Sequence, residues 1–165
     1  MGRQKHVTGQ RDKDRMHRLA DMLRLRDGLG FQVRVVTTRA NQLFEELTGQ
    51  NAITARQYGA LLTLHQRGSM TLTELADAIS VDRSTLTEMV RRLQRAGLIT
   101  RAGNGQDRRS AVVALSPEGE AAVAQLTPGA AKVQDLLLAP LGPAERRQLM
   151  LWIKMIAAGP STEGK

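Results

Sequence analysis

The chain has 165 residues, with 24 lysines and arginines against 16 aspartates and glutamates, no cysteine and only 2% aromatic residues. This length supports one compact domain, or one domain with an extra helical arm, and it can bury a core without a disulfide or a metal. The absence of cysteine excludes disulfide scaffolds, thiolate zinc sites and cysteine nucleophiles. The formal net charge of +8 predicts a polyanionic partner.

No membrane contact, metal or cofactor is expected. The longest apolar stretches, such as 111–115 and 136–141, are far shorter than the roughly 18 residues that a membrane span needs. The charged first 16 residues lack the apolar segment of a signal peptide, so we expect a soluble, cytoplasmic protein. The three histidines lie far apart without ligand spacing, at His6, His17 and His65.

The excess positive charge lies in two blocks. Residues 1–26 hold eight basic and three acidic residues, and residues 81–110 hold seven and three. The first block is a polar basic arm that could equally be a solvated tail. The second block is better organised, and its residues predict a function.

Four helices are predicted before residue 98. The first covers about 29–48, because apolar residues recur there at helical intervals. Capping boxes, Thr54 with Gln57 and Thr71 with Glu74, predict the starts of the second and third helices. Asp82 can cap the fourth, which ends at Gly97.

The apolar period then changes. Residues 98–100 and 111–115 predict a two-stranded hairpin with a long polar tip. Ser116-Pro117-Glu118 predicts a helix start, and this helix continues toward Ala139, although Pro128-Gly129 should kink or break it. Gly142-Pro143 begins the last helix, whose apolar stripe is Leu149, Trp152, Ile153 and Ile156.

The order of these elements is that of a winged helix-turn-helix, in which a short helix, a tight turn, a second helix and a hairpin follow one another. The second helix must bury one stripe and present short side chains to the major groove of DNA. Its candidate DNA-contacting residues are Arg83, Ser84, Thr85, Thr87, Arg91 and Arg92. The alternative for Arg91 and Arg92, together with Arg95, is a solvated helix face.

The predicted hairpin tip holds Arg101, Asp107, Arg108 and Arg109, with Gly103 and Gly105 allowing it to turn. An arginine-bearing tip suits insertion into the minor groove, whose negative potential attracts it.

The segments TLTELADAISVDRSTLTEMVRRLQRAGLITR and DRRSAVVALSPEGEAAV resemble the MarR family of bacterial transcription regulators over about residues 29–158. The resemblance implies a mainly α fold with a small β-hairpin wing, and a homodimer that reads a palindromic operator in double-stranded DNA. It makes Arg109 the minor-groove residue and Asp107 its orienting partner. The apolar stripe of the last helix becomes a dimerisation candidate, with packing inside one subunit as the alternative for Trp152.

The resemblance also divides the chain. It implies a basic N-terminal arm at 1–26, a helical dimerisation region at 27–53 and 116–159, a DNA-binding lobe at 54–115 and a polar tail at 160–165. The arm departs from the shortest family members, and the missing cysteine removes the family's peroxide-sensing mode.

A repressor of this family would be released by a small aromatic acid or its acyl-CoA thioester. An anionic ligand needs a cation beside an apolar wall, and the candidates are Phe31, Arg34, Arg39, Tyr58 and His65. The alternatives are that Phe31 and Tyr58 are core residues and that His65 is a partly exposed helix residue.

The alternative function is that of a winged-helix module that binds protein instead of DNA, without a ligand switch, because such a module has the same element order. An enzyme is not expected, because the chain has no phosphate-binding loop, no dinucleotide glycine pattern and no nucleophile elbow.

Overall fold

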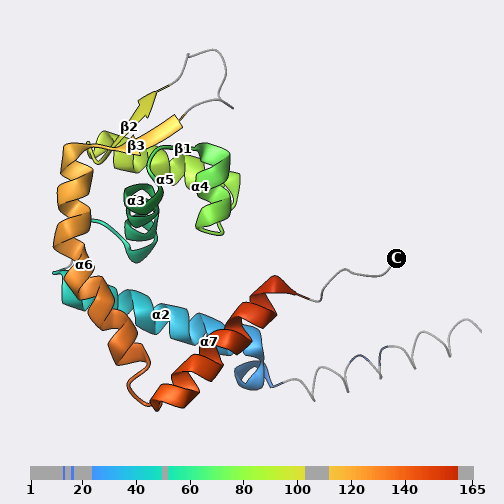
Figure 1. Ribbon diagram of the computed structural model, residues 1–165. Coiled ribbons are helices and arrows are strands. Elements are labelled where there is room, and N and C mark those ends of the chain that lie inside the picture. The colour runs from blue at the N-terminus through green and yellow to red at the C-terminus, as the bar shows by residue number, and fades with distance from the viewer. Residues whose placement is uncertain (1–12, 14–15, 17–23, 50–51, 103–111, 160–165) are drawn as a thin grey trace, which may run out of the picture. The chain divides into compact units, whose positions relative to one another are not determined.

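The computed structural model describes residues 13, 16, 24–49, 52–102 and 112–159 (Figure 1). The chain divides into two compact units, 1–39 and 40–165. The boundary falls inside the helix α2, Leu29–Thr48. In the first unit, a single 3-10 turn, η1 (Leu25–Asp27), precedes α2, and most of the side chains of α2 up to Arg39 are exposed.

The second unit contains a lobe of three helices, α3 (Ala55–Arg67), α4 (Leu72–Ala78) and α5 (Arg83–Arg95). Both expected capping boxes are present, at Thr54 with Gln57 and at Thr71 with Glu74. Asp82 caps α5 by accepting the Thr85 N–H at 2.8 Å. Ser80, with φ of 54°, occupies the left-handed region that allows the chain to turn sharply between α4 and α5.

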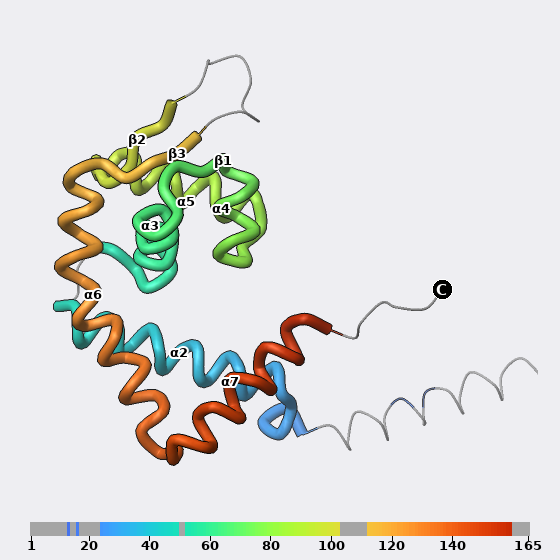
Figure 2. The backbone as a smooth tube through the Cα atoms, viewed as in Figure 1, coloured from blue at the N-terminus to red at the C-terminus, as the bar shows by residue number. Residues whose placement is uncertain are grey.

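A three-stranded antiparallel sheet covers one side of these helices, as the backbone trace shows (Figure 2). The expected hairpin is formed by β2 (Ile99–Ala102) and β3 (Val112–Leu115). The sequence prediction of two strands was incomplete, since β1 (Met70–Thr71) pairs with β3 through Met70 opposite Val113. A strand of two residues is too short to show the alternation of apolar and polar residues from which a strand is predicted.

The helix α6 (Pro117–Leu137) starts at the expected Ser116 cap and runs without a break through Pro128, so of the predicted kink or break the break does not occur. Pro128 has no N–H, so the carbonyl of Ala124 loses its helical hydrogen bond, and Ala124 is an exposed residue. Leu126 and Val133, on either side of the proline, are buried in the same apolar cluster and hold the helix in place. The last helix, α7 (Pro143–Ala158), begins at Gly142 as expected.

Two apolar clusters form the core of the second unit. One lies within the lobe and includes Leu61, Leu75, Leu86, Leu93 and Val113. The other joins Leu43 and Phe44, at the end of α2, to Tyr58 of α3 and to Leu126 and Val133 of α6. The lobe is therefore a packed body that holds α5 by its inner side. None of the described helices is long and apolar enough to cross a membrane.

Candidate nucleic-acid interface

The helix α5 has one buried side and one exposed side. Leu86, Met89, Val90 and Leu93 are buried in the lobe. At 100° per residue, Ser84, Thr87, Glu88, Arg91 and Arg95 share the opposite side, where all but the half-buried Glu88 are exposed. We call these five residues the outer face of α5. Four of them carry hydroxyl or guanidinium groups, which can contact DNA, and Glu88 carries a carboxylate.

Asp82 organises the first turn of α5. Its carboxylate accepts the Thr85 N–H, the Ser84 hydroxyl at 2.5 Å and the Thr85 hydroxyl at 2.6 Å. These bonds, above all the one from Ser84, hold the pKa of Asp82 far below its usual value. The cap is thus an ionised carboxylate at neutral pH.

Arg83 lies beside the outer face of α5 and points toward the preceding helix. Its guanidinium donates to the Thr73 hydroxyl at 2.6 Å. This bond joins the start of α5 to α4, the other helix of the helix-turn-helix, so Arg83 has a structural partner as well as its expected contact with DNA.

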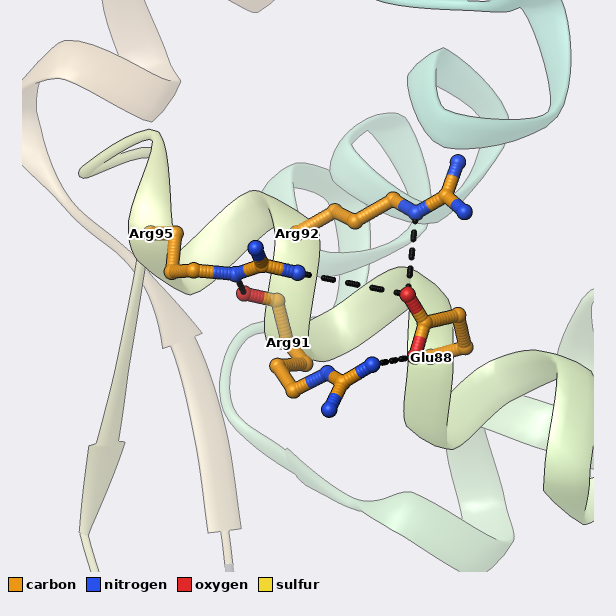
Figure 3. Close-up of polar contacts among 4 residues, drawn as sticks. All are labelled: Glu88, Arg91, Arg92 and Arg95. Carbon is orange, nitrogen blue, oxygen red and sulfur yellow. Dashed lines mark hydrogen bonds and ion pairs between the residues drawn. The ribbon is translucent and has the colours of Figure 1, made fainter.

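Three arginines of α5 are arranged around one carboxylate, as the close-up shows (Figure 3). Glu88 accepts hydrogen bonds from Arg91 and, at 3.1 Å, from Arg92, and Arg95 lies 3.9 Å away. We call Glu88, Arg91, Arg92 and Arg95 the arginine cluster. The hydrogen bond from Arg92, followed by the charge of Arg91, lowers the pKa of Glu88, so the cluster carries three positive charges and one negative charge.

A cavity of about 450 Å³ opens between α4, α5 and β2. Leu72, Leu86 and Val90 form its apolar wall, and Arg83, Arg91 and Arg101 are among its polar lining residues. An apolar wall with several guanidinium groups suits a small anion that has a flat apolar body.

The base of the wing is fixed to the end of α5. The Ser116 hydroxyl donates to the Gly97 carbonyl at 2.6 Å, and the Ser116 N–H donates to the Leu98 carbonyl at 3.2 Å. Arg101 lies in strand β2, opposite Val113, and not in the hairpin tip as predicted. Asp107, Arg108 and Arg109 lie outside the residues that the structure describes.

The five ligand-binding candidates have different surroundings. The Arg34 guanidinium lies 5.5 Å from the centre of the Phe31 ring, and Arg39 is an exposed residue of the same helix. Tyr58 is buried, with its hydroxyl 3.0 Å from that of Thr127 and its ring 5.5 Å from Phe44. His65 is exposed, and its Nδ1 lies 2.6 Å from a carboxylate oxygen of Glu120 on α6. The cavity beside α5 has none of these five in its lining.

The apolar stripe of α7 is exposed in the single chain. Trp152 is 55% exposed, Ile153 48% and Ile156 59%, while Leu149 is partly buried. The alternative of core packing within one subunit is therefore wrong for Trp152. Within the described segments, no three histidine or acidic side chains are grouped to hold a metal.

The sequence prediction missed Glu88 as a member of the site. The signal was present, because Arg91, Arg92 and Arg95 follow Glu88 at three, four and seven residues, all within reach on one side of a helix. The cavity residues Leu72 and Gln94 were also missed, and they have no local sequence signal, because the cavity forms between three elements.

Known proteins share this architecture. Residues 53–111 match the model of the MarR family. The organic hydroperoxide resistance transcriptional regulator of Bacillus subtilis is 30% identical over 99 residues, which are 60% of this chain and 67% of that protein. These matches are to transcriptional regulators and not to enzymes.

Two solved structures are informative. The Escherichia coli MarR variant complexed with operator DNA is 28% identical, covers 76% of this chain and 91% of its own, and has a TM-score of 0.69. Bordetella bronchiseptica BpsR, whose DNA binding is regulated by 6-hydroxynicotinic acid, has a TM-score of 0.74 with coverage of 82% and 96%. At 24% identity, BpsR shows the shared fold alone.

Proposed function

Because the chain belongs to the MarR family of DNA-binding transcription regulators, we propose that it is a homodimeric repressor released from a palindromic operator by a small aromatic acid or its CoA thioester. The observation that carries this proposal is the outer face of α5, where hydroxyls and arginines lie opposite a fully buried apolar stripe. A helix held in this way can enter the major groove, which is about 12 Å wide, without losing its packing.

The dimer is supported by α7. Its exposed residues Trp152, Ile153 and Ile156 form an apolar stripe that a second copy of the chain would cover. A two-fold dimer presents two recognition helices, which must lie about 34 Å apart to read two half-sites on one side of the DNA. The same symmetry explains why the proposed operator is palindromic.

The effector site that we favour is the cavity between α4, α5 and β2. Arg83 and Arg91 belong to both this cavity and the DNA-contacting region. A ligand carboxylate held there neutralises cations that DNA phosphates also need. The ligand therefore binds the DNA-free protein more tightly, which is the condition for release. The apolar wall beside these guanidinium groups supports an aromatic acid as the ligand class.

The second effector region that we propose contains Phe31, Arg34 and Arg39. Tyr58 and His65 lie in the other unit of the chain and are separate candidates for ligand binding. The stacked Arg34 and Phe31 offer a cation next to an aromatic face. Calorimetry with 6-hydroxynicotinic acid separates the two regions. If the cavity is the site, Arg101→Ala weakens ligand binding by about tenfold, the worth of a charge-assisted hydrogen bond, and Arg34→Ala leaves it unchanged. The reverse pattern assigns the ligand to the second region.

The function is tested by titrating the protein with the DNA upstream of its own gene at several salt concentrations. We expect the logarithm of the affinity to fall with the logarithm of salt, with a slope near −0.9 for each phosphate neutralised. Arg109→Ala and Arg92→Ala should each weaken binding, and an aromatic acid or its CoA thioester should release the DNA. Salt-insensitive binding, or no effect of either variant, would favour a protein-interaction module instead.

A further inference from the structure

The first two turns of α5 carry three hydroxyl groups, on Ser84, Thr85 and Thr87. A hydroxyl has one proton to donate and lone pairs that accept, so it can usually contact any base edge or a phosphate. In this protein the three protons already have acceptors, and this determines what the hydroxyls can offer to DNA.

Two of the protons are taken by Asp82. The Ser84 hydroxyl lies 2.5 Å from Oδ1 and the Thr85 hydroxyl 2.6 Å from Oδ2. An ionised carboxylate has no proton and only accepts, so both hydroxyls must be the donors. Bonds of this kind are charge-assisted and stronger than bonds between neutral groups.

The third proton is taken by the backbone. The Thr87 hydroxyl donates to the Arg83 carbonyl at 2.7 Å, and a carbonyl can only accept. All three hydroxyls therefore have only lone pairs to offer to a molecule that contacts them. Ser84 and Thr87 lie on the outer face of α5, and the half-buried Thr85 lies beside it.

In the major groove, the donors are the amino groups of adenine and cytosine, whereas guanine and thymine present acceptors. We propose that Ser84, Thr85 and Thr87 act together as a hydrogen-bond acceptor array that selects adenine or cytosine on the strand it faces. Every base pair has one amino group in this groove, so the array determines which strand carries the amino base. This inference rests on the proposed DNA-binding function and adds to it a rule for base selection.

The array also separates two kinds of contact. Phosphate oxygens are acceptors, so these hydroxyls cannot donate to them without breaking their internal bonds. Phosphate binding is then left to guanidinium groups such as those of the arginine cluster, which have protons to spare.

The test uses the full chain and a pool of random-sequence duplexes. Selection with the wild type and with Ser84→Ala, Thr85→Val and Thr87→Val identifies the positions at which each variant loses base preference. We expect each of these positions to accept both adenine and cytosine, and to reject guanine and thymine, on the strand that the array faces. In the selected duplex, N6-methyladenine or N4-methylcytosine at such a position should lower the affinity about tenfold, since the methyl group replaces the donor proton in the groove.

Asp82→Asn should exchange the donor and acceptor roles in one of the bonds between residue 82 and the hydroxyls. An asparagine still caps the helix by accepting the Thr85 N–H, but its NH₂ group donates, so a hydroxyl must accept and its own proton becomes available. Since the NH₂ group takes the place of Oδ2, the affected hydroxyl is that of Thr85, and we expect this variant to tolerate guanine or thymine at the position that Thr85→Val identifies. Asp135→Asn, an exposed site on α6 with the same change in charge, should keep the wild-type preference. Circular dichroism checks that both variants are folded.

The outcomes are distinct. Acceptance of a base pair in both orientations at the affected positions, discrimination there between adenine and cytosine on the faced strand, no effect of the methylated bases, or an unchanged preference in Asp82→Asn would each overturn the acceptor array while leaving DNA binding intact. If no sequence is enriched and no duplex is bound, the proposed function itself fails.

Discussion

Glu88 places a negative charge in the middle of a cationic helix side. It bonds to Arg91 and Arg92 and lies 3.9 Å from Arg95. These guanidiniums are exposed, so the stability gained from the pairs is small. Their effect on DNA binding is larger, because every phosphate that approaches the arginines also meets the carboxylate.

We therefore expect Glu88→Gln to strengthen binding to any duplex. Removing the negative charge makes one more positive charge available to phosphates, which should raise the affinity about threefold to tenfold at low salt and steepen the salt slope by up to about 0.9. Fluorescence anisotropy with operator and random duplexes measures both quantities. Asp135→Asn is the control for net charge, and an unchanged slope in Glu88→Gln would contradict the expectation.

Asp82 makes the lobe sensitive to acid. Its pKa is lowered in the folded chain, so its contribution to stability is complete above the ordinary aspartate pKa of 3.8 and is lost as the pH falls through the lower folded pKa. We expect the difference in unfolding free energy between wild type and Asp82→Asn to be constant from pH 7 to about 4 and to shrink below that. Urea unfolding at successive pH values measures it, and a difference that grows in acid would contradict this assignment.

At the scale of elements, the contact between α6 and the wing depends on a glycine. A β-carbon on Gly119 would lie 2.0 Å from the Leu98 carbonyl oxygen and 3.0 Å from the Leu115 side chain. The first turn of α6 can approach the strand only because this side chain is missing. The glycine of the Ser116-Pro117-Glu118-Gly119 segment thus fixes the position of the wing base beside α5.

Gly119→Ala should lower the free energy of unfolding by about 3 kcal/mol, since the backbone at Leu98 must move to relieve the overlap. The matched control is Gly59→Ala on α3, where a β-carbon meets nothing within 4 Å. There alanine should stabilise the helix by up to about 1 kcal/mol. Thermal unfolding distinguishes the two, and equal shifts in the same direction would show that the close contact at Gly119 has no energetic effect.

At the scale of the whole molecule, the exposed stripe of α7 should determine the assembly. Burying a side chain such as Trp152 or Ile153 in a dimer is worth about 1.5 to 3 kcal/mol. These residues are about half exposed in the single chain. A dimer with two lobes is needed to read two half-sites, so the loss of this contact should also reduce operator affinity.

Ile153→Glu is expected to give a monomer at micromolar concentration and to weaken operator binding by at least tenfold, because a charge is placed in the proposed interface. Arg147→Asp is the control, because Arg147 lies on the opposite side of α7 and this substitution changes the net charge by more than Ile153→Glu does. Sedimentation velocity measures the oligomeric state. If Ile153→Glu were still a dimer, the apolar stripe of α7 would not be the dimer interface.

The sequence by itself determined the helices of the lobe, their caps and the position of the cationic helix. Capping boxes such as Thr71 with Glu74 join residues three apart, and the apolar period of α5 repeats within one helix. Both signals can therefore be recognised in a short stretch of sequence. The charge of residues 81–110 indicated a polyanionic partner for the same reason.

Only the tertiary structure decided the remaining features, because they depend on residues far apart in the chain. Strand β1 exists through the pairing of Met70 with Val113, and α6 continues through Pro128 because its neighbours are held in a core shared with α2 and α3. The cavity beside α5 needs β2 as its third wall. The net charge of +8 thus indicated what the protein binds, while packing determined which arginines and hydroxyls face outward to bind it.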